Sequence, residues 1–73
     1  MAEIVLRVHL MSGEHVDVTY KEDGASPGEI VERATEALAD GNGALRCRHG
    51  DRLIVLYGRG VASFEVAPRG AVL

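Results

Sequence analysis

Five arginines are the residues best suited to chemistry, and we predict that they form a binding surface. A guanidinium group donates paired hydrogen bonds to carboxylates and phosphates, so grouped arginines can hold an acidic protein or a nucleic acid backbone. Two of them alternate along an expected strand, and the others lie near turns or on the first strand; the set is Arg7, Arg46, Arg48, Arg52 and Arg59. A protein partner is our prediction. Nucleic acid is the second choice, since a net charge of −3 and only three aromatic residues are less typical of a nucleic-acid-binding protein.

The charges are divided unevenly between the two halves of the chain. Residues 1–43 contain nine acidic and three basic side chains, a balance of −6. Residues 44–73 contain five arginines against Asp51 and Glu65, a balance of +3. Each half therefore offers a surface of one sign, which favours contacts with charged partners.

A second group of chemical residues lies on the expected first hairpin. His9, His15 and Asp17 share its polar face and could together bind a metal, which leaves a small metal-binding protein or enzyme subunit as a further alternative. Cys47 and His49 share a strand face, but an inward-facing thiol would meet no substrate. We therefore predict no catalytic residue, no metal site and no cofactor, and we interpret the chain as a non-catalytic binding or regulatory module.

The elements that must position these residues follow from hydrophobic periodicity. Alternating apolar residues predict strands over 3–11, 15–20, 44–49, 52–57 and 61–66. Between the second and third strands, apolar residues recur at helical spacing from Ser26 to Asp40. The pattern predicts a single α+β domain over residues 1–73, of order ββαβββ, with one helix packed on an antiparallel or mixed sheet of four or five strands.

The expected helix has clear ends and two different faces. Ser26 is a good N-cap, Pro27 suits the first helical position, and Glu29 completes a capping box. We expect Gly41 to cap the C-terminus. The face opposite the apolar arc is mostly acidic, and it is either an ordinary solvated surface or a docking face for a basic partner.

The order of elements resembles the ubiquitin-like β-grasp fold. A hairpin from Ile4 to Tyr20, a helix from Ser26 to Leu38 and the strand Arg52-Leu53-Ile54-Val55 carry this resemblance. It implies that the first and last strands lie side by side in parallel. The tail from Arg69 to Leu73 lacks the Gly-Gly of conjugating or sulfur-carrying members, so the resemblance concerns the fold alone.

The strand 52–57 is apolar on both faces, and one helix can cover only one face of a sheet. Either Ile54 and Leu56 or the alternating set Leu53, Val55 and Tyr57 must therefore remain uncovered. We predict a two-fold homodimer, with self-association through Ile54, Leu56, Val72 and Leu73. The competing outcome is a sheet that curls into a small barrel, or a tail that covers the sheet.

The sequence shows no recognisable targeting signal, and we therefore expect the protein in the cytoplasm. We find no basic signal-peptide start and no apolar run long enough to span a membrane, so we expect no membrane partner. The single cysteine favours the reducing cytoplasm. Seven arginines against one lysine are typical of a GC-rich bacterial or phage genome.

Overall fold

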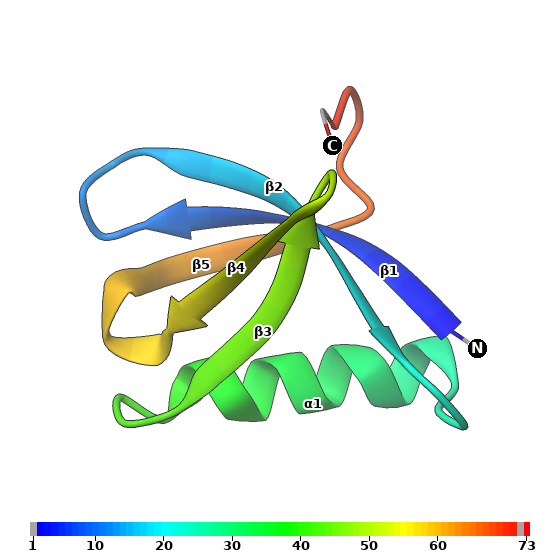
Figure 1. The fold of residues 1–73 in the computed structure, drawn as a ribbon. Helices are drawn as coiled ribbons and strands as arrows, with labels where there is room; N and C mark the ends of the chain where they lie inside the picture. The colour runs from blue at the N-terminus through cyan, green and yellow to red at the C-terminus, as the bar shows by residue number, and fades with distance from the viewer. Residues whose placement is uncertain (1, 72) are drawn as a thin grey trace.

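A computed structural model of the chain describes residues 2–71 and 73 and shows one helix packed on a five-stranded antiparallel sheet (Figure 1). The elements are β1 (Ala2–Leu10), β2 (His15–Glu22), α1 (Pro27–Ala39), β3 (Ala44–His49), β4 (Arg52–Tyr57), the three-residue 3-10 turn η1 (Gly58–Gly60) and β5 (Val61–Val66). The predicted order ββαβββ is confirmed.

The sheet has the strand order β4-β3-β2-β1-β5, and each neighbouring pair is antiparallel. The first and last strands are neighbours, as in a β-grasp fold, but Val8 lies opposite Phe64 in an antiparallel register. The β-grasp alternative is therefore wrong. The reason lies in η1, which carries the chain to the end of β1, where the N–H of Met11 donates to the carbonyl of Gly60 over 2.9 Å. Because β5 starts where β1 ends, it must run back along β1.

The sheet is strongly curled. β4 and β5 form its two edges, yet only the three residues of η1 connect them, so the edges converge at this turn (Figure 1). No ladder joins β4 to β5 within residues 2–71, and the curled sheet stays open along that gap. On the other side, β2 and β3 share a single bridge, between Thr19 and Arg48. The predicted alternative of a curling sheet is thus close to what the chain adopts.

The concave side of the curled sheet and α1 enclose the core. Leu6, Val8 and Val18 are fully buried on the sheet, and Ile30 and Ala34 are fully buried on the helix. The remaining buried apolar residues are Ile4, Ala25, Leu38, Leu45, Cys47 and Leu56. The inward positions predicted for Leu45 and Cys47 are confirmed.

The helix begins as predicted and ends differently. The Ser26 hydroxyl accepts a hydrogen bond from the N–H of Glu29, and the Glu29 carboxylate accepts one from the N–H of Ser26. This second bond lowers the pKa of Glu29. At the other end, the predicted Gly41 cap is wrong: the Asp40 carboxylate accepts from the N–H of Asn42 over 2.9 Å and so terminates the helix with a side-chain turn.

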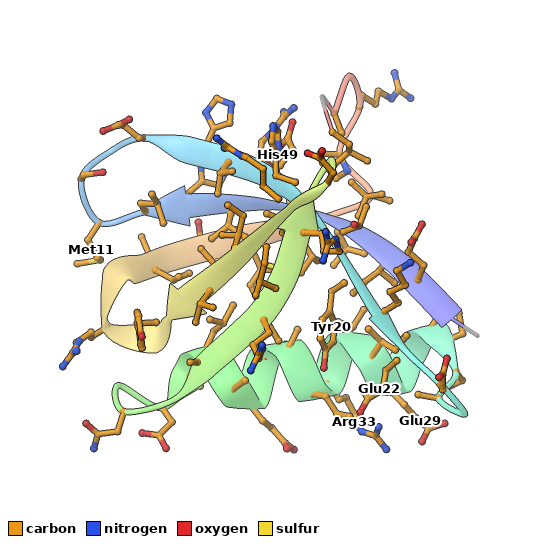
Figure 2. The ribbon with its side chains drawn as sticks, in the orientation of Figure 1. Met11, Tyr20, Glu22, Glu29, Arg33 and His49 are labelled. Atoms are coloured by element: carbon orange, nitrogen blue, oxygen red, sulfur yellow. The ribbon has the colours of Figure 1, made fainter. Side chains whose placement is uncertain are left out.

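The helix surface that faces solvent carries the acidic residues expected there. Its one base, Arg33, is bound by carboxylates, since it lies 2.6 Å from Glu22 on β2 and 3.9 Å from Glu29 (Figure 2). The hydrogen bond to Glu22 raises the pKa of Arg33. In the described part of the chain, no helix is long and apolar enough to cross a membrane.

Candidate binding surface

The convex face of the β3–β4 hairpin combines arginines with exposed apolar side chains. In the register of the two strands, Arg48 lies opposite Leu53 and Arg46 lies opposite Val55. Leu53, Val55 and Tyr57 alternate along β4 and are 50%, 41% and 54% exposed. We call this surface the arginine–apolar face and define it by six residues: Arg46, Arg48, Leu53, Val55, Tyr57 and Arg59. Arg52 begins β4 and alternates with Leu53, so it belongs to the other side of the strand.

Two of the residues predicted to mediate self-association, Ile54 and Leu56, lie on the inward face of β4, so this part of the prediction is wrong. Leu56 is buried opposite Leu45, and Ile54 packs against the same core opposite Cys47. These two side chains are not available to a second copy, because the curled sheet turns them toward α1. Of the tail residues in that prediction, Leu73 is exposed and Val72 lies outside the described residues.

The three arginines of the face and Arg52 at the start of β4 have no acidic partner among the described residues. Arg48 donates to the backbone carbonyl of Asp51 over 2.5 Å, and the guanidinium of Arg59 lies 5.7 Å from the centre of the Tyr57 ring. Residues 44–60 contain these four arginines and one acid, Asp51, giving a local charge of +3. The face is therefore positive and lacks its own counter-charges.

A groove of ≈490 Å³ borders the C-terminal end of β4. Val55 and Tyr57 line one side, and the β1–β2 turn lines the other with Met11, which is 69% exposed (Figure 2). The other lining residues are Leu10, Ser12, Leu56, Arg59, Gly60 and Val61. This groove offers apolar contacts beside the arginines.

Arg7 does not join the other four arginines, which corrects the predicted set of five. It lies on β1, which β2 separates from β3. Its guanidinium donates two hydrogen bonds, of 2.8 and 3.2 Å, to the buried carboxylate of Asp17. This hydrogen bonding raises the pKa of Arg7. Because Arg7 and Asp17 face each other in the hairpin register, the pair neutralises itself and leaves little charge for a partner.

The histidines lie near Asp17 but bind separate partners. His9 and His15 are opposite each other, with ring centres 5.9 Å apart, and His9 lies 3.0 Å from the Glu65 carboxylate. The ring N–H of His49 donates to the backbone carbonyl of Asp17 over 2.7 Å. Within the described residues, no three His, Cys, Asp or Glu side chains are grouped so as to hold a metal ion.

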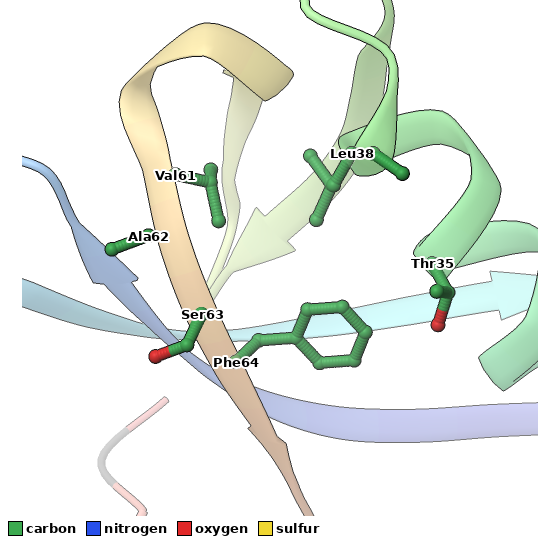
Figure 3. Close-up of a pocket in the computed structure, with 7 residues that line it drawn as sticks. Thr35, Leu38, Val61, Ala62, Ser63 and Phe64 are labelled. Carbon is green, nitrogen blue, oxygen red and sulfur yellow. The ribbon is translucent and has the colours of Figure 1, made fainter.

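A second, smaller groove separates α1 from β5 (Figure 3). Its volume is ≈310 Å³; the Phe64 ring extends from β5 toward Thr35, and Val61 lies across from Leu38. The remaining lining residues are Thr35, Ala39, Val61, Ala62 and Ser63. On α1, the exposed residues Glu32 and Glu36 lie three positions before the lining residues Thr35 and Ala39. Residues three apart are neighbours on a helix surface, so acidic side chains flank this groove.

Cys47 is expected to react slowly with alkylating reagents while the protein is folded. Burial raises the pKa of the thiol to about 11, and its sulfur donates a hydrogen bond to the carbonyl of Ile54. Since the thiolate is the reactive form, iodoacetamide at pH 8 should modify the native protein at least about a hundredfold more slowly than the chain unfolded in guanidinium. Mass spectrometry follows the reaction; equal rates in the two states would contradict the inward position.

Comparison of the chain with protein-family models, with curated proteins and with solved structures gave no match. The candidate site therefore depends on the geometry described above.

Proposed function

We propose that the chain is a non-catalytic protein-binding module whose ligand site is the arginine–apolar face. The observation that carries the proposal is the combination of three arginines without acidic partners and three exposed apolar side chains on one face of β3, β4 and the turn that follows. Exposed apolar residues beside charged ones are typical of interaction surfaces. The free thiol of Cys47 supports a cytoplasmic location for this module.

The charge of the face selects the class of ligand. A local charge of +3 attracts carboxylates, and guanidinium groups bind them with paired, directional hydrogen bonds. The apolar row on β4 adds contacts for Val, Leu or aromatic side chains. The proposed ligand is therefore an acidic segment of a partner protein that carries apolar residues between its acids.

A displayed library of random peptides tests this proposal. Selection on the immobilised protein should enrich sequences in which Asp or Glu accompany apolar residues. The double variant Arg46→Glu with Arg48→Glu should weaken binding of an enriched peptide at least about tenfold. Lys21→Glu with Arg69→Glu is the matched control, because it changes the net charge equally at exposed positions outside the face. Enrichment of basic peptides, or equal losses in both double variants, would contradict the proposal.

Two further measurements test the two alternative occupants of this face, nucleic acid and a second copy of the chain. Gel shifts with single-stranded and duplex DNA test the nucleic acid alternative; binding that falls steeply between 50 and 200 mM salt, on the order of a hundredfold for four phosphate contacts, would replace the protein ligand. Light scattering tests the homodimer. A mass near 7.8 kDa is expected, whereas twice that mass, lost on Leu53→Glu, would make a second copy the occupant.

A further inference from the structure

We infer that the acidic segment binds by adding as an extended strand to the free edge of β4. This inference rests on the proposed function and names the way in which the same site holds its ligand. Strand addition to a sheet edge supplies main-chain hydrogen bonds for affinity and alternating side-chain contacts for specificity. Strand addition requires backbone N–H and C=O groups of β4 that β3 does not already bind.

The hydrogen-bond register shows that alternate residues of β4 point away from β3. The N–H of Gly58 donates to the carbonyl of Gly43 over 3.0 Å, and these two residues continue the register by one step beyond Ala44 and Tyr57, so they occupy a hydrogen-bonded position. Hydrogen-bonded and non-bonded pairs alternate along an antiparallel ladder. The bonded pairs are then 45 with 56, 47 with 54 and 49 with 52. The N–H and C=O groups directed to the free edge belong to Leu53, Val55 and Tyr57.

The other side of β3 supports this alternation independently. Arg48 lies opposite Leu53 in a pair that the alternation makes non-bonded, so its carbonyl should point away from β4. The Thr19 hydroxyl of β2 does donate to that carbonyl, over 3.5 Å. The backbone groups of β4 at the same level therefore face the open edge.

The surroundings of this edge fit an acidic strand. Arg52 begins β4, and Arg59 follows its end, so a guanidinium lies near each end of the edge. The groove of ≈490 Å³ runs beside Val55 and Tyr57 and can receive apolar side chains of the added strand. A second copy of β4 fits less well, because a two-fold contact would bring the arginines of both copies together.

The free edge of β5 has the same backbone geometry and the opposite charge. The N–H of Ala67 donates to the carbonyl of Val5 over 2.7 Å, which by the same alternation directs Phe64 and Val66 to the edge away from β1. Glu32 and Glu36 rim the neighbouring groove, so an acidic segment is repelled there. The β5 edge is therefore an internal control for the β4 edge.

Amide resonances can locate the added strand directly. The probe is the peptide acetyl-DVEVDVE-amide, titrated into ¹⁵N-labelled protein. We expect binding to shift the amides of Leu53, Val55 and Tyr57 and to slow their hydrogen exchange, while the amides of Ile54 and Leu56 are already protected by β3. Phe64 and Val66 should remain unchanged. No binding at millimolar peptide, or changes centred on β5, would overturn the inference.

Backbone methylation separates strand addition from side-chain contact. Two versions of the peptide carry N-methyl groups on one or the other set of alternate residues. A strand pairs with one edge through alternate N–H groups only, so one version should bind at least about tenfold more weakly and the other like the parent. If both bind like the parent and Arg46→Glu with Arg48→Glu still abolishes binding, strand addition is wrong and the proposed function stands. If the double variant binds normally, the proposed function itself fails.

A proline on β4 removes one backbone N–H from the protein, just as N-methylation removes backbone N–H groups from the peptide. Val55→Pro removes an N–H that points to the free edge and leaves the ladder with β3 intact, so the variant should fold and lose peptide binding. Ile54→Pro removes an N–H directed to β3 and should destabilise the hairpin. Undiminished binding by folded Val55→Pro protein would overturn the inference, and the methylated peptides decide the question if that variant does not fold.

Discussion

Gly58→Ala is expected to lower the free energy of unfolding by about 3 kcal/mol, which is a large part of the stability of a 73-residue domain. A Cβ at this position would overlap the backbone carbonyl of Asp40 and would lie 2.7 Å from that of Leu38. Both carbonyls belong to the end of α1, so relief requires the helix to move away from η1. Urea denaturation followed by circular dichroism measures the change.

Gly60→Ala is the control for this prediction. It lies in the same turn η1, a Cβ there meets no atom within 4 Å, and its backbone is not in the left-handed region. Its free energy of unfolding should change by less than about 0.5 kcal/mol. Equal effects of the two substitutions would mean that α1 does not pack closely against η1.

Leu6→Ala should cost about 3 kcal/mol of stability. Leu6 is fully buried on β1, which lies between β2 and β5, and it sits opposite Val18 on one side and Val66 on the other. Removing its side chain leaves a cavity in the centre of the sheet, where three strands limit how far the neighbours can move. Thermal and urea unfolding both report the loss.

Leu53→Ala is the matched control, and it should weaken peptide binding while leaving the stability almost unchanged. Leu53 is half exposed on the edge strand β4, so truncation should change stability by less than about 0.5 kcal/mol. Binding of the acidic peptide should weaken, because Leu53 belongs to the arginine–apolar face. A large loss of stability in Leu53→Ala, with peptide binding unchanged, would contradict the assignment of the two faces of β4.

Local patterns in the sequence were sufficient to predict the elements of this fold. Alternating apolar residues mark the strands, and the capping box of Ser26 and Glu29 marks the start of the helix. The apolar period changes from two residues in the strands to about 3.6 in the helix, which separates the helix from the strands on either side. The outward positions of Arg46 and Arg48 also follow from alternation alone. These features depend on neighbouring residues and need no knowledge of the rest of the chain.

Features set by distant contacts were not predictable in the same way. The direction of β5 depends on where η1 delivers the chain, and β4 is apolar on both faces, so its pattern does not show which face turns inward. The pairing of Arg7 with Asp17 depends on the length of the first turn: a two-residue turn at Ser12 and Gly13 would place Arg7 opposite Val18, whereas the three-residue loop 11–13 places it opposite Asp17. Because the sequence does not fix the length of this turn, it does not show that Arg7 is already paired with a carboxylate.

The place of β1 between β2 and β5 has a consequence during translation. β2 follows β1 after four residues, but about fifty residues separate Leu10 from Val61. At ~5–20 residues per second, the ribosome takes roughly 3–10 s to make that interval, and throughout it one edge of β1 has no strand to pair with. The nascent chain carries Arg7 and His9 on this strand, where they interrupt the apolar sequence from Ile4 to Leu10. They can act as gatekeepers that discourage neighbouring polysome-bound chains from pairing through β1 before β5 emerges.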